Sequence, residues 1–353
     1  QAGAENSVGG LAQAHADNVP ILVLPGGNNL NLLGVRPNFS VGHTYKDVTR
    51  RIETIYKPEQ IVGAMRRAFN ALRNGPGGPV VVEMSEDVCA CEVPAGPAYH
   101  PPTAARQLPA TDDIDAAAEA LLNAKQPLIW AGAGVLFASA TQELKKLAEL
   151  TQIPVFCTMP GKSAFDERHP LALGAGSRAT TLAAHNWIQT CDVILALGSS
   201  LTWPLYSQFI PAGKTIIHNT DNPDELNKDE DVAVPLLGDA RMTIQALIAA
   251  IEERGGGDKS RWPNTAERLA KHREEWLAQW QPLLDSDEEP LNTYRVIGDI
   301  DRTLDRENSI VTHDVGAPRD SIVPFYTATT PHSYIGWGKT THLGFGIPLM
   351  IGA

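Results

Sequence analysis

The residues best suited to chemistry lie near the end of the chain, in two glycine-containing pieces. The first reads Ser-Ile-Val-Thr-His-Asp-Val-Gly-Ala-Pro-Arg over residues 309–319, and the second reads Gly-Lys-Thr-Thr-His-Leu-Gly-Phe-Gly-Ile-Pro over residues 338–348. The β-branched run in the first piece predicts a short buried strand that ends in a tight loop at Asp314. The second piece predicts a glycine turn leading into a helix, with Pro348 in its first turn. Open α/β sheets bind phosphorylated ligands where a strand end meets a helix N-terminus, so both pieces are candidates for such a site.

The middle of the chain holds a second pair of candidate ligand-binding loops. Gly132 and Gly134 follow an apolar run at 127–131 that predicts a buried strand, which is the setting of a dinucleotide-binding loop. The third glycine of that fingerprint is missing, so the spacing matches it only in part. Gly198 and Ser199 follow a second apolar run in the same way. Both a bound nucleotide and an empty crevice are compatible with these four residues.

Histidine side chains near these stretches are candidates for proton transfer. A histidine can act as a general acid or base because its unperturbed pKa, about 6.5, lies close to neutrality. His43, His313 and His342 are the candidates, and a purely structural role is the alternative for each.

The elements that must position these residues follow an α/β pattern. Strand and helix signals alternate along the chain, which predicts three consecutive doubly wound parallel-sheet units. Residues 28–57 are expected to be rich in loops. The expected organisation comprises the rear of a first unit at 1–95, a proline-rich linker at 96–112, a central Rossmann-like domain at 113–255, a connector helix at 256–290 and the start of a third unit at 291–353. We expect the first and third units to be truncated, because the chain starts without a methionine and stops where a helix begins.

Composition excludes several classes of function. The formal net charge of −12 argues against nucleic acid or an anionic membrane surface as a partner, since both require a basic face. No apolar run is long enough to span a bilayer and no signal-peptide pattern opens the chain, so a cytoplasmic location is expected. The four cysteines are too few and too scattered for a disulfide framework, and their spacing favours reduced thiols over a metal site.

The two pieces at the end of the chain resemble the opening of the diphosphate-binding domain in one enzyme family. In thiamine-diphosphate enzymes of the acetolactate synthase and 2-oxo-acid decarboxylase type, a D-V-G strand end precedes a glycine-rich G-F-G segment and a helix. Here the matching residues are Asp314-Val315-Gly316, then Leu-Gly-Phe-Gly-Ile-Pro at 343–348 and Ile-Gly-Ala at 351–353.

Two stretches near the start of the chain resemble the pyrimidine-binding domain of the same family. Residues 74–87 are similar to the end of that domain, although Ser85 stands where proline is usual. Gly3 to Asn6 partly match its G-P-G-x-x-N turn, and the alternative for Asn6 is a simple helix N-cap.

The resemblance implies roles in a thiamine-diphosphate site. Leu343 would support the two rings of the cofactor, and the carbonyl of Thr341 would accept a hydrogen bond from its aminopyrimidine. The loop from Gly316 through Ala317 and Pro318 to Arg319 would wrap the diphosphate, where backbone N–H groups and a positive charge suit the ligand. Asn6 and Gly344 complete the implied cofactor-binding set.

The central segment resembles the family's middle domain, which shares the fold of sirtuins and holds flavin or ADP in some members. Gly132, Gly134, Gly198 and Ser199 are the candidate contacts for such a nucleotide. Acetolactate synthases carry an acidic-Arg loop after the equivalent glycine, and the different loop at 199–206 counts against FAD.

The resemblance therefore implies a lyase or transferase that acts on a 2-oxo acid, as a decarboxylase or carboligase. It also implies Mg²⁺ and a homodimer or homotetramer. The activating glutamate would precede Gln1 and the Mg²⁺ ligands would follow Ala353, so we expect this fragment to be inactive and to hold no metal ligand. Two alternatives are a nucleotide-binding deacylase or binding module of sirtuin-like fold and a non-catalytic paralogue. The absence of C-x-x-C pairs weighs against a sirtuin zinc site. The sequence does not identify the substrate or its acceptor.

Overall fold

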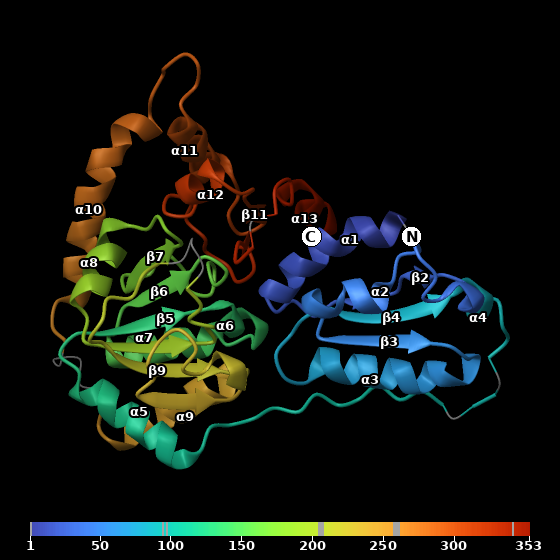
Figure 1. The fold of residues 1–353 in the computed structure, drawn as a ribbon. Helices are drawn as coiled ribbons and strands as arrows, with labels where there is room; N and C mark the ends of the chain where they lie inside the picture. Colours follow the sequence, from blue (N-terminus) through green and yellow to red (C-terminus); the bar gives the residue numbers. More distant parts are fainter. Residues whose placement is uncertain (1, 94, 97, 204–207, 257–261, 341) are drawn as a thin grey trace. The chain divides into compact units, whose positions relative to one another are not determined.

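The computed structural model describes residues 2–93, 95–96, 98–203, 208–256, 262–340 and 342–353. The chain forms two compact units. The first contains Gln1–Arg106 together with Gly338–His342, and the second contains Gln107–Trp337 together with Leu343–Ala353. Both contain a parallel sheet flanked by helices, so the expected α/β class is confirmed (Figure 1). Among the described residues, no helix is both long and apolar enough to cross a membrane.

The sheet of the first unit is built on β4 (Val80–Ser85). The strands β1 (Leu22–Val23), β2 (Gly26–Gly27) and β3 (Arg51–Ile55) all pair with it in parallel. Alternate β4 residues face opposite layers, as the period of a strand requires. Val80 and Val82 pack in the cluster formed with α3 (Ile61–Arg73).

The other face of β4 is covered by the first helices of the chain. Val81 packs with Leu11 of α1 (Ala2–Ala16) and with Val41 of α2 (Val41–Thr44). Figure 1 shows α1 and α3 on opposite sides of the strands. The remaining elements of this unit are the 3-10 turns Leu30–Leu32, Lys46–Val48 and Pro58–Gln60 and the short helix α4 (Glu86–Cys89).

The strand β3 lies within the loop-rich stretch 28–57, where the sequence analysis identified no strand. Charged residues alternate along it, so it lacks an apolar run that would reveal a buried strand. The carboxylate of Glu53 on this strand forms ion pairs with Arg51 Nε at 2.5 Å and with Nη2 of Arg67, on α3, at 2.7 Å. Its place in the sheet depends on backbone pairing with β4, which sequence periodicity alone does not show.

The second unit contains a six-stranded parallel sheet with the order β10-β9-β8-β5-β6-β7. Its strands are β5 (Pro127–Ala131), β6 (Val155–Thr158), β7 (Ala172–Gly176), β8 (Val193–Leu197), β9 (Thr215–Thr220) and β10 (Val234–Leu237). In chain order the strands run outward from β5 to one edge, then start again beside β5 and run to the other edge. This is the doubly wound Rossmann arrangement, whose topological switch point lies between β5 and β8.

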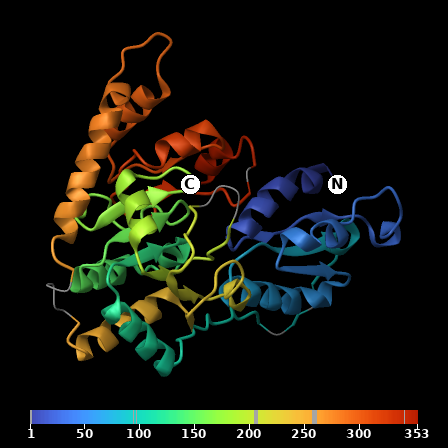
Figure 2. The ribbon, with the colours of Figure 1, turned by 60° about the vertical axis from the view of Figure 1, so that its left-hand side comes forward.

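Two apolar layers enclose this sheet. Ile129 and Leu195 face the layer that contains α5 (Thr111–Asn123), α7 (Thr141–Thr151) and α9 (Ala240–Glu253). The opposite layer contains α8 (Leu182–Thr190) and Leu269 of α10 (Thr265–Leu284). Figures 1 and 2 both show α10 running along the side of the sheet beside α8.

The last part of the second unit shares a core with the six-stranded sheet. It contains α11 (Thr293–Thr303), β11 (Val311–Thr312), α12 (Ala317–Ile322), β12 (Tyr334–Ile335) and α13 (Gly346–Gly352). The strands β11 and β12 pair in parallel, with Val311 opposite Tyr334. Val311, Ile322 and Tyr334 belong to the same buried cluster as Ile129 and Leu195, so this segment is anchored to the sheet.

Candidate cofactor site

The carboxylate of Asp314 joins the two glycine-containing pieces that the sequence singled out. It lies just after β11, and its Oδ1 accepts the N–H of Val315 at 2.8 Å and the N–H of Gly344 at 3.1 Å. Its Oδ2 accepts the N–H of Gly346 at 3.1 Å. The hydrogen bond from Val315, followed by those from Gly346 and Gly344, lowers the pKa of Asp314, so the carboxylate stays charged at neutral pH. One side chain thus holds a strand end against a turn 30 residues further along the chain.

The loop after Asp314 becomes a short helix. Gly316 has φ of +82°, a conformation that favours glycine, and it precedes α12. Gly316, Ala317 and Pro318 are exposed, whereas Arg319 is only 1% exposed. The guanidinium of Arg319 bonds the carboxylate of Asp320 at 3.0 and 3.2 Å. The expected diphosphate contact of Arg319 therefore stays a prediction, and its guanidinium is engaged with Asp320.

The turn held by Asp314 exposes a large apolar side chain. Leu343 is 77% exposed, and Gly344 beside it has φ of +77°. Ile347 and Ile351 of α13 are also exposed, so apolar surface continues along this helix. An exposed leucine on a backbone fixed by hydrogen bonds fits the expected contact with the faces of the cofactor rings. Asp314, Leu343 and the loop 316–319 are called the half-site below, and these residues fit thiamine diphosphate. Thr341, the other residue expected at the rings, lies outside the described residues.

The remaining candidates of the first unit lie on its helices and on the segment 338–342. Asn6 lies within α1, so the alternative interpretation as an N-cap is wrong: the helix already runs from Ala2. His43 is an exposed residue of α2, and its backbone N–H bonds the capping Ser40 hydroxyl at 3.4 Å. The imidazole of His342 lies against Gly9 of α1, where a Cβ would come within 2.3 Å of Nε2. Close packing explains that glycine. The roles of Asn6, His43 and His342 in binding or catalysis stay predictions.

The glycines at the switch point of the six-stranded sheet allow two loops to touch. The N–H of Gly132 bonds Leu197 O at 2.9 Å, and the N–H of Gly134 bonds Gly198 O at 2.8 Å. A Cβ on Gly132 would lie 2.3 Å from Gly198 O and 2.6 Å from the Cα of Ser199. Backbone packing therefore accounts for these glycines without a ligand, and a nucleotide at this position stays a prediction.

Two side chains of β9 hold the loop that follows β8. Asn219 Oδ1 accepts the N–H of Gly198 at 3.2 Å, and His218 Nε2 lies 2.6 Å from Ser199 O. Burial lowers the pKa of His218, so its ring is neutral at neutral pH and its Nε2 donates to that carbonyl.

Sequence reasoning missed a buried ion pair in the loop after β6. Lys162 Nζ lies 2.6 Å from both carboxylate oxygens of Glu167, and both side chains are buried. Glu167 also accepts the N–H of Ala328 at 2.7 Å, which ties this loop to the segment before β12. Burial raises the pKa of Glu167, and Lys162 opposes that effect. A lysine five residues before a glutamate carries no periodic signal, so only the structure reveals the pair.

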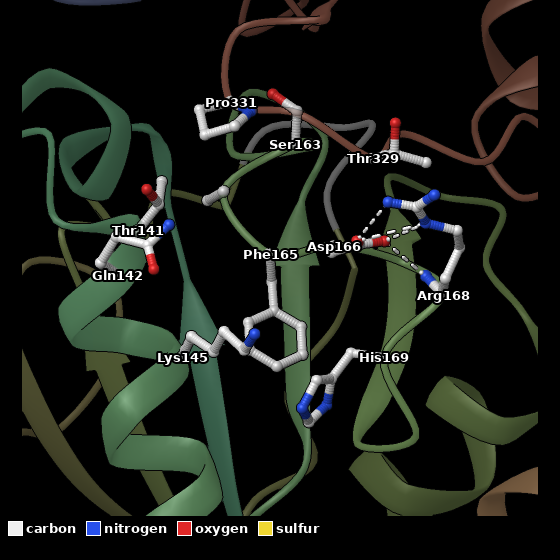
Figure 3. A pocket seen from close by; sticks show the side chains of 11 residues that line it. Thr141, Gln142, Lys145, Ser163, Phe165, Asp166, Arg168, His169, Thr329 and Pro331 are labelled. Atoms are coloured by element: carbon white, nitrogen blue, oxygen red, sulfur yellow. Dashed lines mark hydrogen bonds and ion pairs between the residues drawn. The ribbon is translucent and has the colours of Figure 1, made fainter. Parts of the chain in front are cut away.

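A cavity of about 280 Å³ lies beside the same loop, between the start of α7 and residues 329–331 (Figure 3). Phe165 and His169 meet in it edge to face, with ring centroids 4.9 Å apart. Arg168 in its lining bonds the carboxylate of Asp166 at 2.8 to 3.2 Å, and Figure 3 marks these contacts. Lys145, also in the lining, lies 3.8 Å from the carboxylate of Glu149. Each of these cations faces a carboxylate, so the lining does not indicate an anionic ligand.

The described residues contain no group of three or more His, Cys, Asp or Glu side chains placed to hold a metal ion. All four cysteines are free, with Cys89 and Cys91 exposed. Burial raises the pKa of Cys157 to about 12 and that of Cys191 to about 11, so both buried thiols are protonated at neutral pH.

Comparison with known proteins shows to which proteins this chain is similar. Residues 114–247 match the family described as the central domain of thiamine pyrophosphate enzymes. Over 99% of its length, the chain is 32% identical to a probable acetolactate synthase large subunit of Methanocaldococcus jannaschii. It is 27% identical to the large subunit of acetolactate synthase isozyme 3 of Escherichia coli, again over 99% of its length. The chain spans 61% and 62% of these two relatives.

A solved structure has the same fold. The benzoylformate decarboxylase of Polynucleobacter necessarius matches with a TM-score of 0.81 and 20% identity, over 99% of this chain and 64% of that one. The fold is thus shared with this decarboxylase, and the central segment is similar to the central domain of thiamine pyrophosphate enzymes. The two sequence relatives are acetolactate synthase subunits. A sirtuin-like deacylase is not favoured, because the central segment matches the thiamine pyrophosphate enzymes.

Proposed function

We propose that the natural protein containing this chain is a thiamine-diphosphate-dependent enzyme that decarboxylates a 2-oxo acid and releases the remaining fragment or joins it to a second carbonyl compound. The observation that carries the proposal is the Asp314 carboxylate, which holds the D-V-G strand end against the turn that exposes Leu343. Relatedness to acetolactate synthases along 99% of the chain supports the same activity.

Each part of the half-site has a proposed task. In this proposal Leu343 supports the two rings of the cofactor, and the Thr341 carbonyl would accept a hydrogen bond from its aminopyrimidine. The exposed backbone at Gly316, Ala317 and Gly344 would lie against the diphosphate. When bound, thiamine diphosphate supplies a nucleophilic carbon and an electron sink for cleavage of the bond next to the carbonyl. The chain contributes placement of the cofactor and, by covering apolar surface, exclusion of water.

The metal ion, the substrate class, the location and the oligomeric state of the enzyme are also proposals. Mg²⁺ would accompany the diphosphate, because a hard cation neutralises its oxygens. The net charge of −12 and the relation to acetolactate synthases support a small-molecule 2-oxo acid as the partner rather than nucleic acid. A cytoplasmic homodimer or homotetramer is the proposed state, and FAD or ADP at Gly132, Gly134, Gly198 and Ser199 remains a separate prediction.

The proposal is tested by calorimetric titration of the natural full-length protein with thiamine diphosphate, with and without Mg²⁺. We expect saturable binding that requires Mg²⁺, followed by CO₂ release from at least one 2-oxo acid. Failure to bind in either condition, combined with binding of NAD or FAD, would overturn the proposal and assign function to the central domain.

The role of Leu343 is tested by Leu343→Ala, which should weaken cofactor binding by about tenfold or more because a large apolar contact is lost. The matched control is Leu291→Ala, since Leu291 is also exposed, at 60%, and lies in the same unit but outside the half-site. Equal dissociation constants for the two variants would remove Leu343 from the site.

A further inference from the structure

A continuous column of aromatic rings leads from the interior of the second unit to the exposed turn. Tyr326 and Tyr334 have ring centroids 6.0 Å apart, and Tyr334 and His313 are also 6.0 Å apart. His313 stacks on Trp337 at 5.3 Å with an interplanar angle of 11°. Trp337 meets Phe345 edge to face at 5.0 Å. Phe345 lies between Gly344 and Gly346, the two residues whose N–H groups bond Asp314.

The inner end of the column is anchored to the buried ion pair. Lys162 Nζ lies 5.3 Å from the centre of the Tyr334 ring, within the range of a cation–π contact. The same ammonium group bonds Glu167, which in turn accepts the N–H of Ala328. The rings at this end are therefore held by charges and hydrogen bonds in the buried core.

The outer end of the column is tied to the strand that carries the candidate site. The indole N–H of Trp337 donates to the carbonyl oxygen of His313 at 2.9 Å, so ring stacking and a hydrogen bond join the same two residues. Burial keeps the imidazole of His313 neutral, with a pKa of about 4, which suits a ring stacked on an indole. Trp337 is 3% exposed, so its ring is fully enclosed.

Two kinds of contact therefore fix the turn that carries Leu343. The Asp314 carboxylate holds the backbone at Gly344 and Gly346, and Trp337 holds the side chain of Phe345 between them. The carboxylate sets how close the turn lies to the strand end. The edge-to-face contact restricts the rotation of the turn, because the rings of Phe345 and Trp337 must keep this relative orientation.

We propose that Trp337 and His313 are positioning residues: their stack, through Phe345, sets the orientation of the turn that presents Leu343 and Gly344 to the cofactor. This inference rests on the proposed function, because it assigns a purpose to that turn. In this proposal both residues act on the turn through Phe345 rather than by touching the cofactor.

The experiment compares two buried, stacked tryptophans of the same unit. Trp337→Ala removes the link between His313 and Phe345 in the column. Trp276→Ala removes a different stack, that of Trp276 on Phe325, whose ring centroids are 4.7 Å apart at an angle of 14°. Trp276 lies in the same unit but far from the turn in sequence. Hydrogen–deuterium exchange of peptides covering 343–347 is measured in both variants, together with the dissociation constant for thiamine diphosphate in the full-length protein. Trp337→Phe serves as the conservative variant, since it keeps one aromatic ring in place while it loses the indole N–H and the second, fused ring.

We expect Trp337→Ala to speed exchange at 343–347 and to weaken cofactor binding, each by about tenfold, with Trp276→Ala unchanged in both and Trp337→Phe closer to the original protein. The inference is overturned if the original protein binds the cofactor and Trp337→Ala binds it equally well, or if both alanine variants speed exchange at 343–347 alike. Absence of binding by the original protein would instead refute the proposed function and this inference with it.

Discussion

The carboxylate of Asp314 and the imidazole of His313 are neighbours with opposite electrostatic requirements. Asp314 accepts three backbone N–H groups that favour its charged form, so its pKa is lowered. His313 is enclosed between Tyr334 and Trp337, where burial disfavours the charged form and lowers its pKa to about 4. The same short strand end therefore presents a permanent negative charge and a neutral ring at neutral pH. Each state is set by the contacts of the residue rather than by its type.

His313 predicts a pH dependence of folding stability. Its pKa falls from 6.5 to about 4 on folding, so between these values the unfolded state binds more protons than the folded state. Stability should therefore decrease as the pH falls through this window, by an amount on the order of 3 kcal/mol from this residue. Asp314 and Asp320 oppose the effect and Arg319 adds to it. The measurement is urea unfolding at pH 7 and pH 5 of the original protein and of His313→Leu.

His218 contributes with the same sign, since burial also lowers its pKa, so only the difference between the two proteins reports on His313. His313→Leu should lose less stability than the original protein between the two pH values. The same loss in both proteins would show that His313 titrates as freely in the folded state as in the unfolded state.

At the scale of elements, the strands with continuous apolar runs could be predicted from the sequence. Pro127–Ala131 is such a run and forms β5 with the expected bounds. β3 could not be found in this way, because Arg51 and Glu53 interrupt it, and β7 lacks a continuous apolar run because it contains Gly174 and Gly176. The Asp314 contacts with Gly344 and Gly346 join residues 30 and 32 positions apart, and no local pattern encodes that distance.

The glycines that follow β5 and β8 also show that a local sequence pattern does not identify a contact partner. Their spacing left both a bound nucleotide and an empty crevice open, and their packing is explained by the contact between the two loops themselves. A glycine-rich motif indicates that the backbone approaches a partner closely, and this partner can be a ligand or another loop. Only the coordinates identify the partner here as Gly198 and Ser199.

This packing predicts the effect of adding a single methyl group. Gly132→Ala would place a Cβ 2.3 Å from Gly198 O, so the loops after β5 and β8 must separate. We expect a loss of about 1–3 kcal/mol in the free energy of unfolding, as for other overpacked sites. Gly352→Ala is the control in the same unit, because its Cβ would meet nothing within 4 Å. If denaturant unfolding gave equal stabilities for both variants, the close approach of the two loops would be wrong.

At the scale of the whole molecule, each unit has hydrophobic clusters of its own. The clusters around β4 contain buried residues from Leu11 to Val88, and those around the six-stranded sheet contain buried residues from Ile114 onward. The described residues between α4 and α5 form neither helix nor strand. This distribution gives the second unit the means to remain folded when the chain is cut between the two sets of clusters.

Cleavage by trypsin after Arg106 tests that independence. Arg106 is exposed, and the second unit begins at the next residue, where Gln107 O accepts the N–H of Asp239 at 2.8 Å. Because the clusters that enclose β5 and β8 lie beyond the cut, we expect the 107–353 fragment to keep its near-UV circular dichroism and a cooperative thermal transition. Arg106→Gln is the control, since it removes this cleavage site. A fragment that retains helical signal but loses near-UV signal and cooperativity would show that the second unit requires an intact connection to the first.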